Sequence, residues 1–263
     1  TVRASIGSVT HTATFTTEAA TQIPNGDMEQ WDRTDGATSH WWIDYPGASK
    51  ETTVWGTLNL YTTSEGGSNT NPLSGNRDGM AYHAISGTTH TADAANGSNA
   101  ALIRTVGWGK GNAVGNTAFE KCNHVTRGEL FLGNPTATLE QNYGIAFASR
   151  PASLKFNYKY EPRNAADYGA AIVEVYDADG NVIASDKLTI NAQPQYAPAT
   201  LSLTYAPGAA KAAKLSVIFR SSENEACLSA SKENLDGYKT SGVSNDKTLI
   251  GSKLYIDDIE LTY

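Results

Sequence analysis

Two carboxylates interrupt the apolar middle of the last segment of the chain. Asp257 and Asp258 lie within Ser252–Tyr263, which otherwise has the composition of a β-strand. A buried carboxylate is costly unless it is paired or bound to a metal. We therefore expect this strand to meet a partner that is distant in sequence, and the segment Ile23–Trp31 is the candidate.

Calcium is the metal that such a pairing would suit. It prefers about six to eight oxygen ligands and mixes carboxylates with backbone carbonyls. Glu29 and Asp257 would supply carboxylates, and Gly26 a carbonyl, so that a structural Ca²⁺ would join the two ends of the domain. The alternative is that Glu29 and Asp257 accept hydrogen bonds from local backbone or pair with a lysine or arginine.

Aromatic residues are the second group with chemical potential. The chain has five tryptophans and thirteen tyrosines. A flat ring on a loop stacks on the apolar face of a sugar, whereas the same ring in a core fills space. Trp55 and Trp108 lie in irregular segments and are the ligand candidates, whereas Trp31 and one of Trp41 and Trp42 are expected in the core.

No motif identifies a catalytic residue. The sequence contains neither Gly-x-Ser-x-Gly nor His-Glu-x-x-His, and its histidines are scattered. The carboxylate pair of a glycoside hydrolase is recognised by its separation in space, which a sequence does not give. A carbohydrate-active hydrolase therefore stays open as an alternative, without assigned residues.

Composition excludes several classes of protein. Charged residues make up 18% of the 263-residue chain and the net charge is −7. An acidic balance argues against nucleic acid, which needs a basic surface. No apolar run reaches the length of about 18 residues that a membrane span requires. Two cysteines, Cys122 and Cys227, allow at most one disulfide, and whether they pair is left open.

The pattern of short apolar segments predicts an all-β protein. Alternating residues and Gly/Asn/Asp turns separate the segments, which is typical of an antiparallel β-sandwich or jelly roll. Three long loops are expected, at 62–79, 107–127 and 222–251. The predicted strands are Trp41–Tyr45, Met80–Ile85, Ala100–Val106, Gly128–Leu132, Ser153–Tyr160, Ala170–Tyr176, Val182–Ile190, Ala199–Tyr205, Lys214–Ser221 and Lys253–Tyr263.

An ordered series of short motifs carries a family resemblance across about 23–263. The motifs are Ile23–Trp31, Trp55–Asn59, Gly128–Gly133, Ser149–Tyr160, Phe219–Ser222 and Gly251–Leu261. Together they resemble the carbohydrate metabolism domain (PCMD) of Bacteroidetes secreted and surface proteins. The resemblance implies a jelly roll similar to carbohydrate-binding modules, in an extracellular or outer-membrane lipoprotein. It also implies an upstream β domain, of which residues 1–22 would be the end or a linker.

The resemblance extends to the predicted metal site. Calcium-stapled carbohydrate-binding jelly rolls have a similar Asn-Gly-x-Phe-Glu start and a similar Ile-Asp-x-Ile end. Glu29 and Asp257 match the ligand positions, and Met28 replaces the usual aromatic residue. The family offers no catalytic residue that this chain matches.

These observations favour a non-catalytic glycan-binding module. Polar side chains orient a sugar and aromatic rings supply contact area. We expect the ligand on one solvated, concave sheet face that carries the residues Lys155, Asn157, Lys159, Glu174 and Arg220, with Trp55 or Trp108 stacking from a loop. A glycan-active enzyme and a structural or adhesin module are the alternatives.

Overall fold

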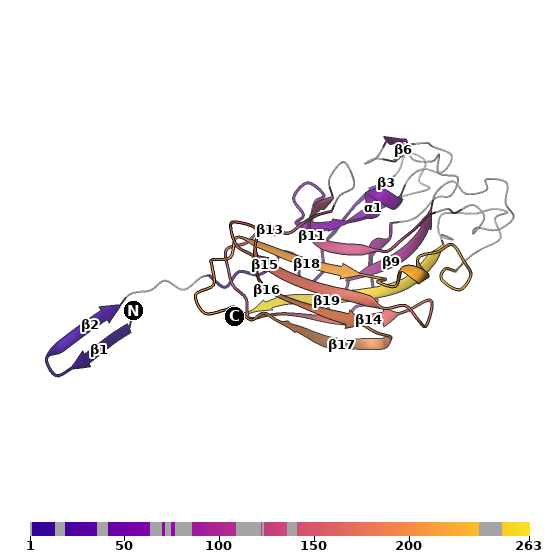
Figure 1. Ribbon diagram of the computed structural model, residues 1–263. Helices are drawn as coiled ribbons and strands as arrows, with labels where there is room; N and C mark the ends of the chain where they lie inside the picture. Colours follow the sequence, from indigo (N-terminus) through magenta and orange to yellow (C-terminus); the bar gives the residue numbers. More distant parts are fainter. Residues whose placement is uncertain are drawn as a thin grey trace.

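Two antiparallel sheets face each other and make the chain a β-sandwich, which confirms the predicted fold class (Figure 1). The computed structural model describes residues 2–13, 19–35, 42–63, 70–71, 75–76, 86–108, 122, 124–135, 141–236 and 249–263. Within these ranges, no helix has the length and apolar character needed to span a membrane.

The six-stranded sheet contains the C-terminal strand at its centre. Its spatial order is β10-β9-β19-β14-β17, with β8 also paired to β9. The strands are β8 (Thr88–Thr91), β9 (Ala100–Trp108), β10 (His124–Thr126), β14 (Ser153–Glu161), β17 (Gln193–Ser202) and β19 (Ile250–Thr262).

The seven-stranded sheet forms the other layer. Its order is β12-β11-β18-β15-β16, with β5 paired to β11 and β13 paired to β18. The strands are β5 (Trp55–Thr57), β11 (Glu129–Pro135), β12 (Gln141–Tyr143), β13 (Ile145–Ala146), β15 (Gly169–Tyr176), β16 (Val182–Ile190) and β18 (Lys214–Arg220). From β14 onward the chain crosses repeatedly between the two sheets, as in a jelly roll.

Smaller elements complete the described structure. The hairpins are β1 (Val2–Ile6) with β2 (Val9–Ala13), β3 (Trp31–Asp35) with β4 (Trp42–Pro46), and β6 (Thr70–Asn71) with β7 (Gly75–Asn76). A single helical turn, α1 (Asn59–Thr62), and a 3-10 turn, η1 (Glu225–Cys227), are the helical segments. The first hairpin occupies the region that the sequence assigned to a preceding domain or linker.

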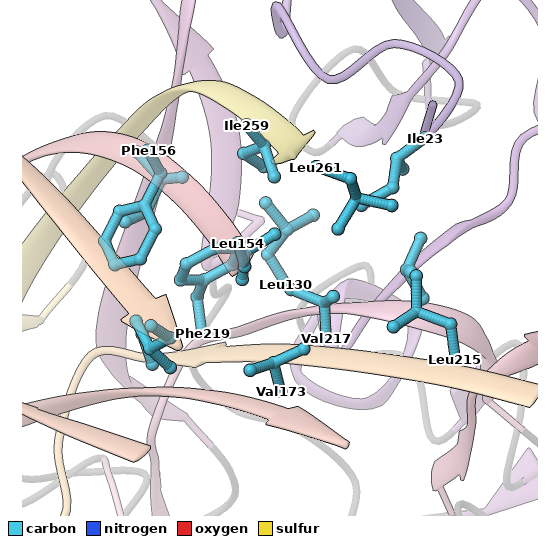
Figure 2. Close-up of a cluster of buried hydrophobic side chains, with 14 of the residues drawn as sticks. Ile23, Leu130, Leu154, Phe156, Val173, Leu215, Val217, Phe219, Ile259 and Leu261 are labelled. Atoms are coloured by element: carbon cyan, nitrogen blue, oxygen red, sulfur yellow. The ribbon is translucent and has the colours of Figure 1, made fainter. Parts of the chain in front are cut away.

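The core fills the space between the two sheets, because alternate residues of each strand point inward (Figure 2). Burying one such side chain contributes roughly 1.5–3 kcal/mol. The labelled residues are Leu154, Phe156, Ile259 and Leu261 from the six-stranded sheet, Leu130, Val173, Leu215, Val217 and Phe219 from the seven-stranded sheet, and Ile23.

The predicted strands correspond to observed ones wherever they can be compared. Strand β17 begins at Gln193, six residues before its predicted start, and includes Pro194 and Pro198. Proline cannot donate to a sheet ladder, but β17 is an edge strand, where this is tolerated. The predicted strand Met80–Ile85 lies outside the described residues. Cys122 and Cys227 are both buried free thiols, which answers the open question about a disulfide.

Candidate functional site

The two ends of the sandwich domain are joined as the sequence led us to expect. The amide of Ile259 donates to the carbonyl of Gly26 over 2.7 Å. The Gln22 side chain pairs with the backbone of Leu261, through bonds of 2.7 and 2.9 Å. A Cβ atom at Gly26 would lie 2.3 Å from the Ile259 carbonyl, so this close approach requires glycine. The N-terminal segment therefore runs beside the end of β19.

Asp257 and Glu29 both contact the loop between β8 and β9, residues 92–99. The Asp257 Oδ2 atom accepts bonds from the amides of Ala95 (2.8 Å) and Asn96 (3.1 Å), and its Oδ1 from the Asp258 amide (2.8 Å). Burial raises the pKa of Asp257 above its ordinary value, although these amides oppose the shift. With three backbone amides as donors, the Asp257 carboxylate has a structural role and connects β19 to the 92–99 loop.

Glu29 closes the other side of the same loop. Its Oε1 accepts bonds from the amides of Ser98 (2.8 Å) and Asn99 (3.1 Å). Gly97, which directly precedes Ser98, has a positive φ of 66°, and a Cβ there would lie 2.1 Å from Glu29 Oε1. The loop can therefore wrap around Glu29 only because this residue is glycine.

The contacts seen at Gly26, Glu29 and Asp257 do not fit calcium. Calcium needs converging oxygen atoms, whereas backbone N–H groups converge on Glu29 Oε1 and Asp257 Oδ2 and bring positive hydrogen where a cation would lie. The described residues also contain no group of three or more His, Cys, Asp or Glu side chains able to hold a metal. Calcium binding stays a prediction, and the alternative of backbone hydrogen bonds describes the observed contacts.

Asp258 lies on the same side of the strand as Asp257, which strict alternation does not predict. Its backbone has a positive φ of 50°, and the register of β14 against β19 shifts at this point. Such a bulge re-aims a side chain. Asp258 Oδ2 accepts bonds from Asn96 Nδ2 (2.5 Å) and Asn157 Nδ2 (2.9 Å). Asn157 is therefore committed to a structural bond.

The outward face of the six-stranded sheet holds three of the predicted ligand residues: Lys155, Asn157 and Lys159. The Lys159 Nζ atom lies 3.9 Å from the ring centroid of Tyr255 and forms an ion pair with Asp93. Burial opposes its charge, but the hydrogen bond that Lys159 donates to Asp93, together with the nearby Tyr255, Asp93 and Glu161, raises the pKa of Lys159 above its ordinary value. Only 8% of Lys159 is exposed, so it serves the packing of this face and does not reach outward.

Trp55 and Trp108 are not exposed stacking platforms, which corrects the prediction for both. Trp55 is 2% exposed, packs in the core, and donates from Nε1 to the carbonyl of Pro24 over 2.9 Å. Trp108 is 1% exposed and stacks on His124 with a centroid separation of 4.5 Å. Both residues lie on strands, β5 and β9, and therefore bury their rings where the sequence suggested loops.

Glu174 and Arg220 lie on the other layer, so the predicted ligand residues do not share one face. Arg220 Nε donates to Glu129 Oε1 (2.9 Å), and its Nη2 to the Tyr143 hydroxyl (3.2 Å). The Tyr143 hydroxyl donates to Glu129 Oε2 over 2.8 Å. Burial lowers the pKa of Arg220, but Glu129, Tyr143 and Glu223 together outweigh it, and the net shift is upward. This triad therefore carries a fixed, paired charge at the margin of the sheet.

The outward face of the seven-stranded sheet continues toward Glu174 and Tyr176, both half-buried on β15. The Tyr176 hydroxyl donates to Glu174 Oε2 over 2.5 Å, and burial raises the pKa of Tyr176 to about 12. Lys214 Nζ lies 4.0 Å from the Tyr176 ring centroid. This end of the face thus presents an aromatic ring, a carboxylate and an ammonium side by side.

Ser216 lies directly across from Glu174 on the neighbouring strand β18. It is 1% exposed, and among the described residues its Oγ has no hydrogen-bond partner. Its neighbours Leu215 and Val217 point into the core, so the Ser216 side chain points to the outward face. A buried hydroxyl without a partner costs about 1–3 kcal/mol. Such a group indicates a position where a bound polar molecule would complete the hydrogen bonding.

A pocket lies at the other margin of the same sheet, beside β5. Its volume is about 270 Å³. The ring of Phe131 lies over Gly56, where a Cβ atom would approach it to 2.5 Å. The pocket is lined by Tyr45, Pro46, Lys50, Thr53, Trp55, Gly56, Thr57, Leu60 and Asn134. Trp55 therefore contributes to a pocket wall even though almost none of its surface is exposed.

No family model matches the chain, and no curated protein matches it. Several solved structures are similar to the chain. One is the enzymatically active domain of bacteriophage CBA120 tailspike protein 4, which is 13% identical, with a TM-score of 0.34 over 66% of this chain and 17% of that chain. This chain spans only part of that protein and of two further similar structures: it covers 17%, 52% and 22% of their respective lengths.

Two shorter structures are covered almost fully. TmCBM61 in complex with beta-1,4-galactotriose is 8% identical, with a TM-score of 0.33 over 90% of each chain. The family 11 carbohydrate-binding module of a Clostridium thermocellum cellulosomal cellulase is 9% identical, with a TM-score of 0.33 over 93% of this chain and 96% of that chain.

Sequence reasoning missed Tyr143, Tyr176 and Ser216. Tyr176 ends the predicted strand Ala170–Tyr176, and alternation places it on the same face as Glu174. That signal was present in the sequence. The Ser216 hydroxyl gives no such signal, because its missing partner becomes evident only from the packing of β15 against β18.

Proposed function

We propose that the chain is a glycan-binding module, and that its ligand lies on the outward face of the seven-stranded sheet. The proposal depends on one observation: Tyr176, Glu174 and Ser216 lie close together on adjacent strands. A sugar offers apolar C–H faces to a ring and hydroxyl groups that both donate and accept hydrogen bonds. Glu174 would accept from such hydroxyls, and the buried Ser216 Oγ would gain a partner where the ligand displaces the atoms that cover it.

The side chains of this arrangement would lose little conformational freedom when a ligand binds. Tyr176 is already held by Glu174 and Lys214, so its ring is ordered before a ligand arrives. Preorganised groups spend less of the binding energy on ordering. The paired Arg220–Glu129–Tyr143 triad then bounds the site as a rigid wall.

We further propose that the module functions in an exported or cell-surface protein beside other domains of the same polypeptide. The family resemblance of its motifs and the low fraction of charged residues, 18%, support this context. Mass spectrometry of surface-exposed peptides from the source cells is the direct check. Recovery of the chain only from the cell interior would contradict the proposal.

Affinity electrophoresis through gels containing single polysaccharides tests the binding function. The wild-type protein should be retarded by at least one neutral plant, host or microbial glycan. Tyr176→Ala should weaken that retardation about tenfold, because stacking and one hydrogen bond are lost together. The matched control is Tyr196→Ala on the other sheet, which should bind as the wild type does.

Two outcomes would overturn the proposed function. One is a wild-type protein that migrates freely through every glycan in a broad panel. The other is retardation that Tyr196→Ala abolishes and Tyr176→Ala leaves intact, since this would move the ligand to the six-stranded sheet.

A further inference from the structure

A second cluster of polar and aromatic side chains lies on the hairpin β3–β4, away from the sheet face described above. Arg33 pairs directly with Asp44, and Trp42 with Asp35, in the hairpin register. Directly opposed residues share one face of an antiparallel pair, so Trp31, Arg33, Asp44 and Trp42 face the same way, with the exposed Asp35 on this face at the end of β3. With His90 of β8 they form what we call the Arg33–His90 patch.

A buried carboxylate organises this patch. Asp44 is 0% exposed. Its Oδ1 binds Arg33 Nε over 2.8 Å, and its Oδ2 lies 3.1 Å from His90 Nδ1. The Arg33 and His90 side chains are 44% and 42% exposed. The acceptor therefore lies beneath two donor groups, and the surface of the patch offers donors.

Asn59 and Ser86 hold the backbone of Asp44 in place through hydrogen bonds. The Asn59 Nδ2 group donates to the carbonyls of Asp44 (2.8 Å) and Thr88 (2.7 Å), while its Oδ1 accepts from the Thr88 amide (2.8 Å). The Ser86 hydroxyl accepts from the Asp44 amide and donates to the carbonyl of Trp42. Strands β4 and β8 are thus locked together directly behind the patch, which fixes the positions of its donors.

Two half-buried indole rings flank the donors. Arg33 Cζ lies 4.8 Å from the Trp42 ring centroid. The Trp31 and His90 rings are 5.8 Å apart and tilted by 45°. A guanidinium stacked on a ring is held in one plane. Among the described residues Arg33 is hydrogen-bonded through Nε alone, which leaves its other N–H donors for a ligand.

From this geometry we propose that the Arg33–His90 patch is a second binding site, for a sugar unit that carries a carboxylate. The two carboxylate oxygens of a uronic acid would receive hydrogen bonds from Arg33 and, in the form of His90 with a proton on both ring nitrogens, from His90 Nε2. The pyranose ring would lie against the flanking indoles. A neutral sugar would lack the charge-assisted bonds, which are about twice as strong as neutral ones.

Titration calorimetry with trigalacturonate, neutral galactotriose and sodium sulfate tests this site. Trigalacturonate should bind the wild-type protein, while Arg33→Gln should lose about tenfold in affinity and His90→Gln severalfold. Arg33→Lys keeps a positive charge beside Asp44 but loses the planar fork of donors. This variant should therefore fold normally and still bind weakly. Lys211→Gln, which removes one exposed charge elsewhere, should bind as the wild type does.

The Tyr176→Ala variant separates this site from the sheet-face site, because it should leave trigalacturonate binding unchanged. Loss of binding in Tyr176→Ala with full binding in Arg33→Gln would overturn the second site alone. Equal affinity for galactotriose, displacement by sulfate as effective as by the oligosaccharide, or no binding of trigalacturonate would each overturn it as well.

Discussion

The two outward faces of the sandwich use similar residues in opposite ways. On the six-stranded sheet, Asp257, Asp258, Asn157 and Lys159 have their hydrogen bonds and ion pairs filled by the protein itself. On the seven-stranded sheet, Ser216 lies buried beside an ordered tyrosine, without a hydrogen-bond partner in the part of the chain that the structure describes. Polar side chains on a sheet therefore mark a binding face only where the fold leaves hydrogen bonds for something else to make.

This difference also separates what each face contributes. Carboxylates that receive several backbone amides are expected to carry stability, since removing them strands buried donors. An unpaired hydroxyl costs stability and is retained at that cost. Substitutions on the two faces should thus change different measured quantities: the free energy of unfolding on the six-stranded sheet, and the affinity for a ligand on the seven-stranded sheet.

The largest effect is expected from Asp257→Ala on the structural face. The change strands the amides of Ala95 and Asn96 beneath the 92–99 loop, so the free energy of unfolding should fall by about 3–5 kcal/mol. Urea unfolding followed by tryptophan fluorescence measures it. Glu260→Ala on the same strand is exposed and should change stability by less than about 0.5 kcal/mol. Equal effects of the two substitutions would remove the structural role assigned to Asp257.

A smaller and opposite effect is expected from Ser216→Ala on the binding face. Removing an unsatisfied buried hydroxyl should leave the protein as stable or more stable, by about 0–1 kcal/mol, while glycan affinity falls severalfold. The matched control is Ser153→Ala, whose hydroxyl lies 2.6 Å from that of Thr262 and should cost about 1 kcal/mol without affecting binding. A loss of stability in Ser216→Ala as large as in Ser153→Ala would contradict the contrast between the faces.

The smallest effect is expected from a chelator. Because N–H groups occupy Glu29 Oε1 and Asp257 Oδ2, treatment with EDTA should shift the Tm by less than about 1 °C. Differential scanning calorimetry before and after dialysis, with added Ca²⁺ as the comparison, gives the answer. A Ca²⁺-dependent rise of several degrees would show that the 92–99 loop rearranges to present oxygen atoms, and would restore the calcium site that the sequence predicts.

The sequence predicted the fold more fully than the site. Strict alternation in segments such as Lys214–Ser221 locates β18 and its inward residues, because one side of the strand must be apolar. The association of Ile23–Trp31 with the terminal strand was also foreseen, and the bond from Ile259 to Gly26 shows it. Both follow from local sequence pattern: the alternation in β18, and the carboxylates that interrupt the apolar middle of β19.

The composition of the ligand face could not be predicted, because it depends on which strands share a sheet. Lys159 and Arg220 each alternate correctly within a strand, yet β14 and β18 belong to different layers. Trp55 and Trp108 lie near turns in the sequence, and only the pairing of β5 and β9 with their neighbours shows that both rings are buried. Alternation gives the face of a residue within a strand, but not the partner of that strand.

The paired chain ends have a mechanical consequence. Thr21 binds the side chain of Tyr263, Gln22 pairs with Leu261, and Gly26 with Ile259. The first and last segments of the sandwich domain therefore run antiparallel, and their contacts follow one another along both segments. A pulling force applied at both ends would load these bonds one at a time, in the manner of a zipper, and not all together in shear. The sandwich should therefore yield first at this seam under low force, while the locked β4–β8 region and the binding face keep their shape.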